Sequence, residues 1–346
     1  MNIPDNLTPR WSIIIAVYNR PREIAELLDS AERLQADARD YEIIVVDDGS
    51  TDDLREQLGH RSTALPLRYI HQQHAGPGAA RNRGMREARG EFLIFVDSDC
   101  ILPPGWLAAI ARGVDAGQLD AFGGPDTCRA DFPPLLKAID YAMTSFIGTG
   151  GTRGNRTSVG RYYPRGFNMG FSRRVRDAVG DLNDLRHGQD MDYSMRVHAA
   201  GFRVGLIPEA YIYHKRRATI PRYARQIYNW GKARVTLSRL HPGTLRAVHL
   251  LPAGLVSGLV LLAVATAIFP REPLVRGAWA IAGAGYVAVL LLVVCQTIAK
   301  HRDARVTLLA LVTITLQVAA YGAGTLRALT RRKQQQHADN AAATGK

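Results

Sequence analysis

The chain contains only three cysteines among its 346 residues, and they are widely spaced. Cys100, Cys128 and Cys295 form neither a disulfide framework nor a CxxC metal motif, which is typical of a reducing compartment. The first ten residues are polar, and the first apolar run, residues 13–17, is too short for the hydrophobic region of a secretory signal. We therefore expect neither a disulfide-rich secreted protein nor a cleaved leader.

Acidic residues are missing from residues 210–271, although the first part of this stretch is crowded with Lys and Arg. The whole chain has 44 Lys+Arg against 31 Asp+Glu, a net charge of +13. Such a charge indicates an anionic partner: nucleic acid, a lipid surface or a phosphorylated substrate. A composition of 47% hydrophobic and 22% charged residues excludes a disordered chain or a fibre.

Charged residues are also missing from residues 247–270, 277–299 and 306–326. Each stretch reaches the roughly 20 apolar residues that a bilayer-spanning helix needs, so we predict a transmembrane region over residues 247–329. A large buried helical domain is the alternative. The basic flank before residue 247 predicts a cytoplasmic N-terminal domain, yet three crossings would leave the basic tail outside. A re-entrant or interfacial segment would resolve this conflict, and the pattern does not say which segment it is.

Residues 1–214 predict an α/β fold with a mostly parallel sheet covered by helices on both faces. Short apolar runs alternate there with helical patterns. The predicted strands are residues 12–17, 42–46, 67–70 and 92–96, and the predicted helices are residues 22–34, 52–58, 78–88 and 105–116. Ligands of such sheets bind beyond the carboxyl ends of the strands, so the residues after each strand are the first candidates for a site.

Acidic side chains follow two of these predicted strands. Asp47 and Asp48 come after one strand, and Asp97 and Asp99 after another. Adjacent carboxylates repel unless a cation or a hydrogen-bond donor is present. The pair Asp97 and Asp99 could hold Mg²⁺ or Mn²⁺ together with substrate phosphate oxygens, and a solvated turn is the alternative. The Gly-Ser sequence after Asp48 could equally be a turn that caps a helix.

Five segments together resemble family-2 glycosyltransferases of the GT-A fold. The segments are residues 12–19, 45–52, 78–84, 90–99 and 188–192. Each is modest alone, but their order and their strand context are specific, and the resemblance covers roughly residues 10–240. It implies a nucleotide-diphospho-sugar transferase fold, a nucleotide-sugar donor and an inverting transfer.

The resemblance also implies roles for individual residues. Ala16, Tyr18 and Asp48 match the positions that hold the nucleoside, and Asp97 belongs to the acid pair of the donor site. Asp99 is then the direct ligand of a divalent cation, Mg²⁺ or Mn²⁺.

Three further residues match functional positions of the family. Asp190 matches the general base, and Asp192 is the acid that follows and orients the start of the helix on the substrate side. His214 lies where related enzymes often have another metal ligand, and a simple strand-end histidine is the alternative.

Two departures from the family pattern bear on function. Gln189 stands where the family often has Glu, which leaves Asp190 as the one base. Processive synthases of the family carry Gln-x-x-Arg-Trp, whereas this chain keeps Gln226 and Trp230 but has Asn229 instead of Arg. We expect Gln189, Gln226 and Trp230 on the substrate side, and transfer of a single sugar.

Residues 215–246 predict a basic, aromatic, amphipathic helix that lies on anionic lipid just before the first span. A solvated charged face is the alternative, and the adjacent spans explain the charge better than nucleic acid does. Residues 330–346 form a polar tail.

Together these patterns predict a multi-pass enzyme of the inner membrane with a cytoplasmic catalytic domain. It would move one sugar, by family habit from a UDP-sugar, to a lipid-linked or cell-envelope glycan acceptor. A non-catalytic membrane scaffold that binds nucleotide sugar is the alternative.

Overall fold

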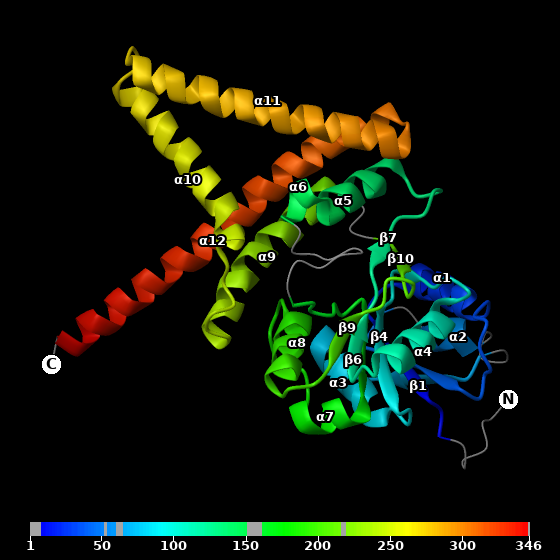
Figure 1. Ribbon diagram of the computed structural model, residues 1–346. Coiled ribbons are helices and arrows are strands. Elements are labelled where there is room, and N and C mark those ends of the chain that lie inside the picture. The colour runs from blue at the N-terminus through cyan, green and yellow to red at the C-terminus, as the bar shows by residue number, and fades with distance from the viewer. Residues whose placement is uncertain (1–7, 52–53, 60–64, 151–160, 216–218, 345–346) are drawn as a thin grey trace. The chain divides into compact units, whose positions relative to one another are not determined.

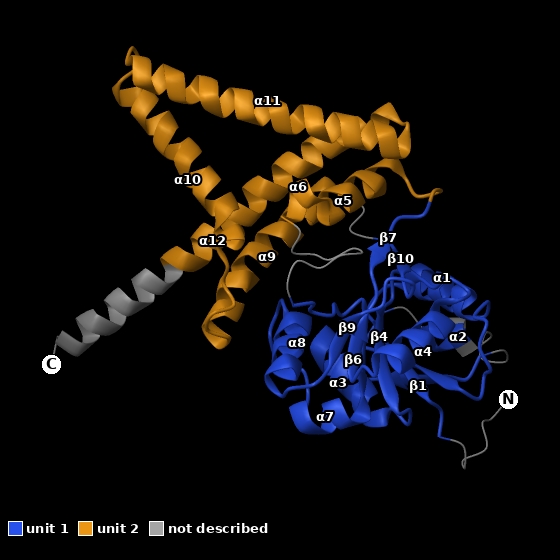
Figure 2. Cartoon of the chain, viewed as in Figure 1, with its two compact units in different colours: residues 1–129, 154–215 blue, residues 130–153, 216–346 orange. Residues whose placement is uncertain are grey.

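The computed structural model describes residues 8–51, 54–59, 65–150, 161–215 and 219–344. The chain forms two compact units, residues 1–129 with 154–215 and residues 130–153 with 216–346 (Figure 2). The first unit ends at Lys215, and the boundary expected after residue 214 stays a prediction. Residues 130–153, which we expected inside the catalytic domain, instead group with the C-terminal helices.

The first unit is built on a seven-stranded sheet with the order β3-β2-β1-β4-β8-β6-β9 (Figure 1). Its strands are β1 Trp11–Val17, β2 Tyr41–Asp47, β3 Leu67–His71, β4 Phe92–Asp97, β6 Ala121–Gly123, β8 Asn168–Ser172 and β9 Val204–Leu206. β1, β2, β3 and β4 are mutually parallel, and β8 runs antiparallel to both of its neighbours. The prediction of a mostly parallel α/β sheet is confirmed.

Alternating side chains of the strands feed two separate cores. The helices are α1 Pro21–Ala31, α2 Leu54–Gly59, α3 Pro77–Glu87, α4 Trp106–Gly117, α7 Arg173–Val179 and α8 Gln189–Ala199. Ile13 and Ile15 pack with α1, α2 and α4, while Ile14 between them packs with α3, α7 and α8 on the opposite face. Because successive strand residues point to opposite faces, a continuous apolar run is what a sheet covered on both faces requires.

Glycine lets α3 approach the sheet closely. A Cβ atom built at Gly84 would lie 2.3 Å from Cγ2 of Ile14, which is fully buried in β1. Any larger side chain would push the helix outward, because protein cores have no spare volume of this size. Gly84 therefore fixes the position of α3 over the sheet, and with it the position of the residues at the start of that helix.

A small second sheet of the first unit has the order β5-β10-β7. It consists of β5 Cys100–Ile101, β7 Asp126–Thr127 and β10 Ile212–His214. β10 is central, so it pairs His214 with Cys100 on one side and Ile212 with Asp126 on the other. The sheet thereby ties the end of the first unit's sequence to the segment that follows β4.

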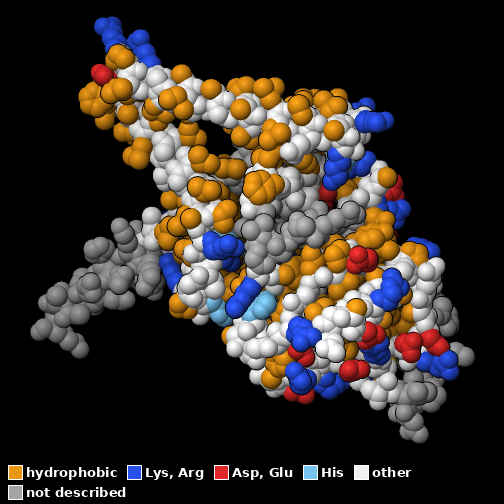
Figure 3. All heavy atoms as spheres, in the orientation of Figure 1, with side chains coloured by type: hydrophobic (Ala, Val, Ile, Leu, Met, Phe, Trp, Pro, Cys, Tyr) orange, Lys and Arg blue, Asp and Glu red, His pale blue; other side chains and the backbone are white. Residues whose placement is uncertain are grey.

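The second unit is helical. Its helices are α5 Pro134–Thr144, α6 Phe146–Thr149, α9 Ile220–Leu240, α10 Ala247–Ile268, α11 Pro273–His301 and α12 Ala304–Thr344. α9 begins at Ile220, where the Thr219 side chain caps the helix by accepting a hydrogen bond from the Arg222 backbone N–H. α10, α11 and residues 304–330 of α12 are long and apolar enough to cross a membrane. Hydrophobic side chains cover the visible surfaces of α10 and α11 (Figure 3).

Candidate functional site

The parallel strands bring their polar ends to one edge of the sheet. In the strand register, Val17 pairs with Asp47, and Ala16 pairs with Asp97. Asp48 follows directly, and its backbone N–H donates to the carbonyl of Val17 at 2.9 Å. Residues that the sequence places in three separate segments therefore meet along one edge, as expected from parallel strands.

Asp48 is buried and holds the loop between β3 and α3. One carboxylate oxygen accepts from Gln72 Nε2 at 2.7 Å and from the Ala75 N–H at 3.0 Å, and the other accepts from the Gly76 N–H at 2.8 Å. These donors satisfy the charge that the sequence left unexplained. The structure thus shows Asp48 shaping the loop beside the expected nucleoside position, and its contact with a nucleoside stays a prediction.

Tyr18 and His74 form an exposed aromatic pair at the same edge. Their rings stack with centroids 4.2 Å apart, and 42% of Tyr18 remains exposed. His74 Nδ1 lies 2.9 Å from a carboxylate oxygen of Asp48, which fixes the ring. Flat, partly exposed rings are suited to stacking against a nucleobase. Sequence reasoning missed His74, because nothing in the local pattern links this loop residue to Tyr18.

Asp97 is paired with Arg81 of α3, at 2.5 Å between the guanidinium and the carboxylate. A Cβ atom built at Gly166 would lie 3.3 Å from Arg81 and 3.4 Å from Cβ of Asp190. Gly166 therefore lies next to both Arg81 and Asp190, and Arg81 in turn pairs with Asp97. Arg81 lies in the segment 78–84 that resembles the family, but the sequence indicates no role for it.

Asp99 lies between two cationic groups. Its carboxylate is 2.5 Å from the Arg20 guanidinium and 3.2 Å from His214 Nε2. His214 Nδ1 is in turn 3.2 Å from the carboxylate of Asp126, which is almost fully buried. The structure thus brings together the two predicted metal ligands, Asp99 and His214, and adds Asp126, for which the sequence offered no signal.

The charges of this cluster shift its titration. Burial by itself lowers the pKa of His214, but the carboxylates of Asp99 and Asp126 outweigh it and raise that pKa to about 9. Burial by itself raises the pKa of Asp99, but His214 and Arg20 outweigh it and lower that pKa below its usual range. In the metal-free protein the two residues therefore form an ion pair at neutral pH.

The residues around His214 suit a divalent cation. Ligand atoms of Asp99, Cys100 and His214 lie within 4.8 Å of one another. Burial raises the pKa of the Cys100 thiol well above its ordinary value, so this side chain stays protonated in the metal-free protein. The remaining carboxylate and imidazole suit Mn²⁺ better than a soft metal, and Asp126 holds the second ring nitrogen as in many metal sites.

Asp190 stands at the start of α8. Gly188 precedes the helix with a φ of +85°, a left-handed conformation that favours glycine. The two carboxylate oxygens of Asp190 accept from the backbone N–H groups of Gly166 and Met191, at 3.1 and 2.9 Å. This carboxylate is half-buried, so it is oriented yet reachable, and its role as a base stays a prediction.

The neighbours of Asp190 have mainly structural contacts. Gln189 packs against α3, where a Cβ atom built at Gly78 would lie 2.1 Å from Gln189 Nε2. Asp192 is 1% exposed and accepts from Asn183 Nδ2 at 2.9 Å and from Arg196 Nε at 3.1 Å. These contacts favour an orienting role for Asp192, and direct substrate contact by Gln189 or Asp192 stays a prediction.

Gln226 and Trp230 lie on α9 in the second unit. Oε1 of Gln226 is buried without a hydrogen-bond donor among the described residues. Their expected place on the substrate side stays a prediction.

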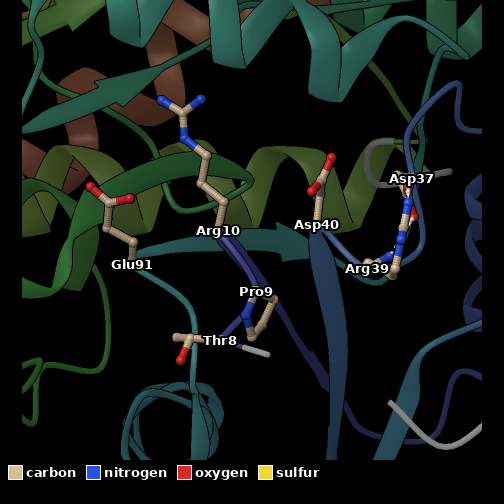
Figure 4. Close-up of a pocket in the computed structure, with 7 residues that line it drawn as sticks. All are labelled: Thr8, Pro9, Arg10, Asp37, Arg39, Asp40 and Glu91. Carbon is tan, nitrogen blue, oxygen red and sulfur yellow. Dashed lines mark hydrogen bonds and ion pairs between the residues drawn. The ribbon is translucent and has the colours of Figure 1, made fainter. Parts of the chain in front are cut away.

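A pocket also lies at the opposite edge of the sheet. Thr8, Pro9, Arg10, Asp37, Arg39, Asp40 and Glu91 line it (Figure 4). Arg10, Asp40 and Glu91 directly precede β1, β2 and β4, so this pocket is at the amino ends of the strands. None of the predicted site residues lines it, and Arg10 is paired with Asp115 of α4.

Comparisons with known proteins point to glycosyltransferases. The model of the family "Glycosyl transferase family 2" matches residues 12–180. The putative glycosyltransferase EpsH of Bacillus subtilis is 38% identical over 108 residues, which are 30% of this chain and 30% of EpsH. The poly(ribitol-phosphate) beta-N-acetylglucosaminyltransferase TarS of Staphylococcus aureus is 33% identical over 113 residues, 32% of this chain and 20% of TarS. The matches thus span less than a third of either relative.

A solved structure resembles the chain over most of its length. The mannosyltransferase PcManGT from Pyrobaculum calidifontis, in complex with GDP-Man and Mn²⁺, superposes with a TM-score of 0.65 and 17% identity. The superposition covers 94% of this chain and 88% of PcManGT. At this identity the likeness shows the fold, a GT-A-like α/β domain followed by apolar helices.

Proposed function

Because residues 12–180 of the chain belong to glycosyl transferase family 2, we propose that the protein is a membrane-bound inverting glycosyltransferase. It transfers a single sugar from a nucleotide-diphosphate sugar to a lipid-linked or cell-envelope glycan acceptor. One observation carries the proposal: Tyr18 and Asp99 follow the carboxyl ends of the neighbouring strands β1 and β4. At this edge Tyr18 stacks on His74, Asp99 contacts His214, and Arg81 pairs with Asp97 beside Gly166, whose N–H donates to Asp190.

The donor binds along this edge. The base stacks on Tyr18, next to Ala16 and to the loop that Asp48 holds. Arg20 and Arg81, which pair with Asp99 and Asp97, are close enough to exchange these carboxylates for phosphate oxygens. PcManGT was solved with GDP-Man, and TarS is named for a transfer of N-acetylglucosamine, so a nucleotide sugar is the supported donor class. A UDP-sugar is the default choice within it.

Asp99 and His214 would hold a divalent cation, Mg²⁺ or Mn²⁺, and the presence of Mn²⁺ in PcManGT supports this. When bound, the cation neutralises the charge that develops on the departing nucleotide diphosphate. Asp126 keeps the His214 ring in the orientation that presents Nε2 toward Asp99. Asp97 lies near Asp99 in the sequence and accepts a hydrogen bond from Arg81. In this proposal its carboxylate contacts the donor.

Asp190 acts as the general base. Its carboxylate takes the proton of the acceptor hydroxyl while that oxygen attacks the anomeric carbon from the face opposite the leaving diphosphate. The new glycosidic bond forms as the bond to the diphosphate breaks, so the anomeric configuration inverts. The N–H groups of Gly166 and Met191 hold the carboxylate in place during this step. Asn229, in place of the Arg of processive synthases, supports the transfer of one sugar.

The membrane attachment follows from the second unit. Three of its helices are long and apolar enough to span a bilayer, and α9 is rich in Arg and Lys with no Asp or Glu. Basic segments stay on the cytoplasmic side of a membrane, which supports an inner-membrane protein with a cytoplasmic catalytic domain. α9 is then an interfacial helix on anionic lipid.

The test uses the full-length protein in detergent or nanodiscs, with Mn²⁺ and a panel of nucleotide sugars and lipid extracts. We expect nucleotide release that depends on donor, metal and acceptor. Asp190→Asn should lower kcat by at least about 10³-fold and leave donor affinity nearly unchanged. The matched control Asp177→Asn, an exposed position on α7 that pairs only with Arg176 among the contacts resolved for it, should keep full activity.

Two results would contradict the proposal. Full activity of Asp190→Asn would exclude this residue as the base. Donor binding without turnover across all acceptors would favour a non-catalytic scaffold that binds nucleotide sugar.

A further inference from the structure

The third apolar helix, α12, is packed differently from α10 and α11. Only 6% of the most apolar window of α10 and of α11 is buried, whereas 39% of that window is buried in α12. The buried side of α12 includes polar side chains, namely Thr307, Thr313, Gln317 and Thr325. α10 and α11 therefore offer apolar surface nearly all round, while α12 is covered by protein along one side.

α10 and α11 form a helical hairpin, and α12 contacts both of its open ends, the start of α10 and the end of α11. Thr297 Oγ1, near the end of α11, donates to Thr307 Oγ1 at 3.1 Å. Gly322 fits against the first turns of α10, where a Cβ atom built at Gly322 would lie 2.4 Å from the carbonyl oxygen of Pro252. Figure 1 shows the same relation, with the other ends of α10 and α11 meeting at their connecting turn. If α10 and α11 both cross the bilayer, the start of α10 and the end of α11 lie on the same side of it. α12 therefore connects two points at a similar depth in the membrane.

The contacts at Thr307 and Gly322 are separated along α12 by a distance comparable with the thickness of the hydrocarbon core. Residues 307 and 322 are about 22 Å apart along a helix at 1.5 Å per residue, most of the roughly 30 Å hydrocarbon core. A helix that crossed the core would move from one membrane side toward the other over that distance. α12 instead begins beside the end of α11 and reaches the start of α10.

The middle of α12 is tied to a segment that cannot cross a bilayer. Thr313 Oγ1 donates to the carbonyl of Ala138 at 3.2 Å, and Gln317 Nε2 donates to the carbonyl of Ala142 at 2.8 Å. Both carbonyls belong to α5, whose 11 residues span only about 16 Å. The segment that contains α5, residues 130–153, continues at both ends into the first unit. Because the first unit lies on one side of the bilayer, this segment must begin and end on that same side.

α9 lies along residues 313–328 of α12 and is strongly basic. Tyr223 Oη donates to Gln317 Oε1 at 2.6 Å, and Arg239 donates to the carbonyl of Ala328 at 2.7 Å. Between these contacts α9 carries further basic residues and no acid. If α12 crossed the bilayer, α9 would carry these charges into the hydrocarbon core, which is costly. In the membrane interface the same charges would meet lipid headgroups.

We propose that only α10 and α11 cross the bilayer, and that α12 lies in the membrane interface with α5 and α9. The exposed side of α12, which includes Leu308 and Val312, then faces the acyl boundary, as in an interfacial amphipathic helix. The basic residues after residue 330 then lie on the same side of the membrane as the first unit, which removes the conflict with the positive-inside rule. This inference rests on the proposed membrane attachment but not on the proposed sugar transfer.

Cysteine accessibility in the full-length protein tests the topology. Single cysteines are introduced as Glu272→Cys in the α10–α11 turn, Ala342→Cys in the tail and Glu209→Cys on the first unit. The background carries Cys128→Ser and Cys295→Ser and keeps the buried Cys100. In intact cells a membrane-impermeant maleimide should label only Glu272→Cys, and the other two should react only after the membrane is opened. Labelling of Ala342→Cys in intact cells, or its absence at Glu272→Cys there, overturns the proposal.

Depth measurements test the orientation of α12 directly. Spin labels are attached to exposed positions along α12, as Leu308→Cys, Val312→Cys, Ala319→Cys and Ala323→Cys in the same background. We expect all four labels to report one shallow depth in lipid bilayers. Control labels at Leu255→Cys, Leu259→Cys and Val264→Cys on α10 should report different depths, with the greatest depth near the middle of this helix, between residues 255 and 259, and a shallower depth at residue 264. A depth maximum between residues 312 and 319 overturns the proposal. Because neither experiment needs turnover, failed sugar transfer with this pattern would reject only the proposed function.

Discussion

Nε2 of His214 lies 3.2 Å from Oδ1 of Asp99, although the two residues are far apart in the sequence. The antiparallel pairing of β10 with β5 produces this contact, since His214 is opposite Cys100, the neighbour of Asp99. The pair is a protonated imidazole beside a carboxylate in the metal-free protein, and in the proposed metal site it would become a ligand pair once the imidazole loses its proton.

Metal binding should therefore depend on pH. The pKa of His214 is raised to about 9, and a cation binds the neutral imidazole, so binding must release a proton. We expect the apparent Mn²⁺ affinity of the full-length protein to rise about tenfold per pH unit from about pH 6.5 to 8.5, and to level off above about 9. Calorimetry in buffers of different ionisation enthalpy measures both affinity and proton release. His214→Gln should lose the slope, and an unchanged slope would contradict the assignment.

The same shift has a stability consequence of opposite sign in the metal-free protein. A histidine whose folded pKa is raised stabilises the fold fully below its unfolded value of roughly 6.5. That contribution is lost as the pH rises through about 9. Hydrogen exchange of the β10 amides should therefore accelerate across this interval in the wild type beyond the ordinary base-catalysed increase. His214→Gln should show only the ordinary increase, and equal behaviour of the two proteins would count against the ion pair.

Asp126 should act as a positioning residue for His214. Asp126→Asn keeps the size of the side chain but removes the charge 3.2 Å from Nδ1. Loss of such a partner typically weakens metal affinity about 10- to 100-fold, and the pH at which affinity levels off should fall. Mn²⁺ electron paramagnetic resonance measures the affinity. The control Asp115→Asn removes an exposed carboxylate that pairs with Arg10 and should bind as the wild type does. Wild-type affinity of Asp126→Asn would exclude the positioning role.

The Tyr18 ring should contribute to nucleotide binding through stacking. Tyr18→Ala removes the ring that stacks on His74, and loss of a base–aromatic stack typically costs about 1–3 kcal/mol. We expect the affinity for nucleoside diphosphate to fall about tenfold or more in calorimetry with Mn²⁺ present. Tyr18→Phe keeps the ring and should keep the affinity. If both variants bind equally well, the base lies elsewhere.

Gly84 should be intolerant of any side chain. Gly84→Ala brings a Cβ atom to within 2.3 Å of Ile14, and overpacking of this kind costs about 1–3 kcal/mol. Hydrogen exchange of the β1 and α3 amides should show the loss. Gly105→Ala is the control, because a Cβ atom built there has nothing within 4 Å. Equal protection in the two variants would show that α3 can move away from the sheet without cost.

The sheet and its helices were predictable because their signals are local. The apolar runs that precede Asp47 and Asp97 have the length and β-branched content of buried strands, and they form β2 and β4. Parallel strands end at one edge, so the gathering of Asp48, Asp97 and Tyr18 followed from the strand order alone. The grouping of residues 130–153 with the C-terminal helices did not follow, because it depends on contacts with residues more than a hundred positions later.

What the sequence by itself determined is therefore the class of the fold, the edge of the sheet where polar residues meet and the three apolar helices, since periodicity and length are properties of short segments. Only the tertiary structure showed that Asp126 holds His214, that His74 stacks on Tyr18 and that α5 and α9 cover one side of α12. These relations join remote segments, and they depend on backbone register and side-chain packing that no local pattern encodes.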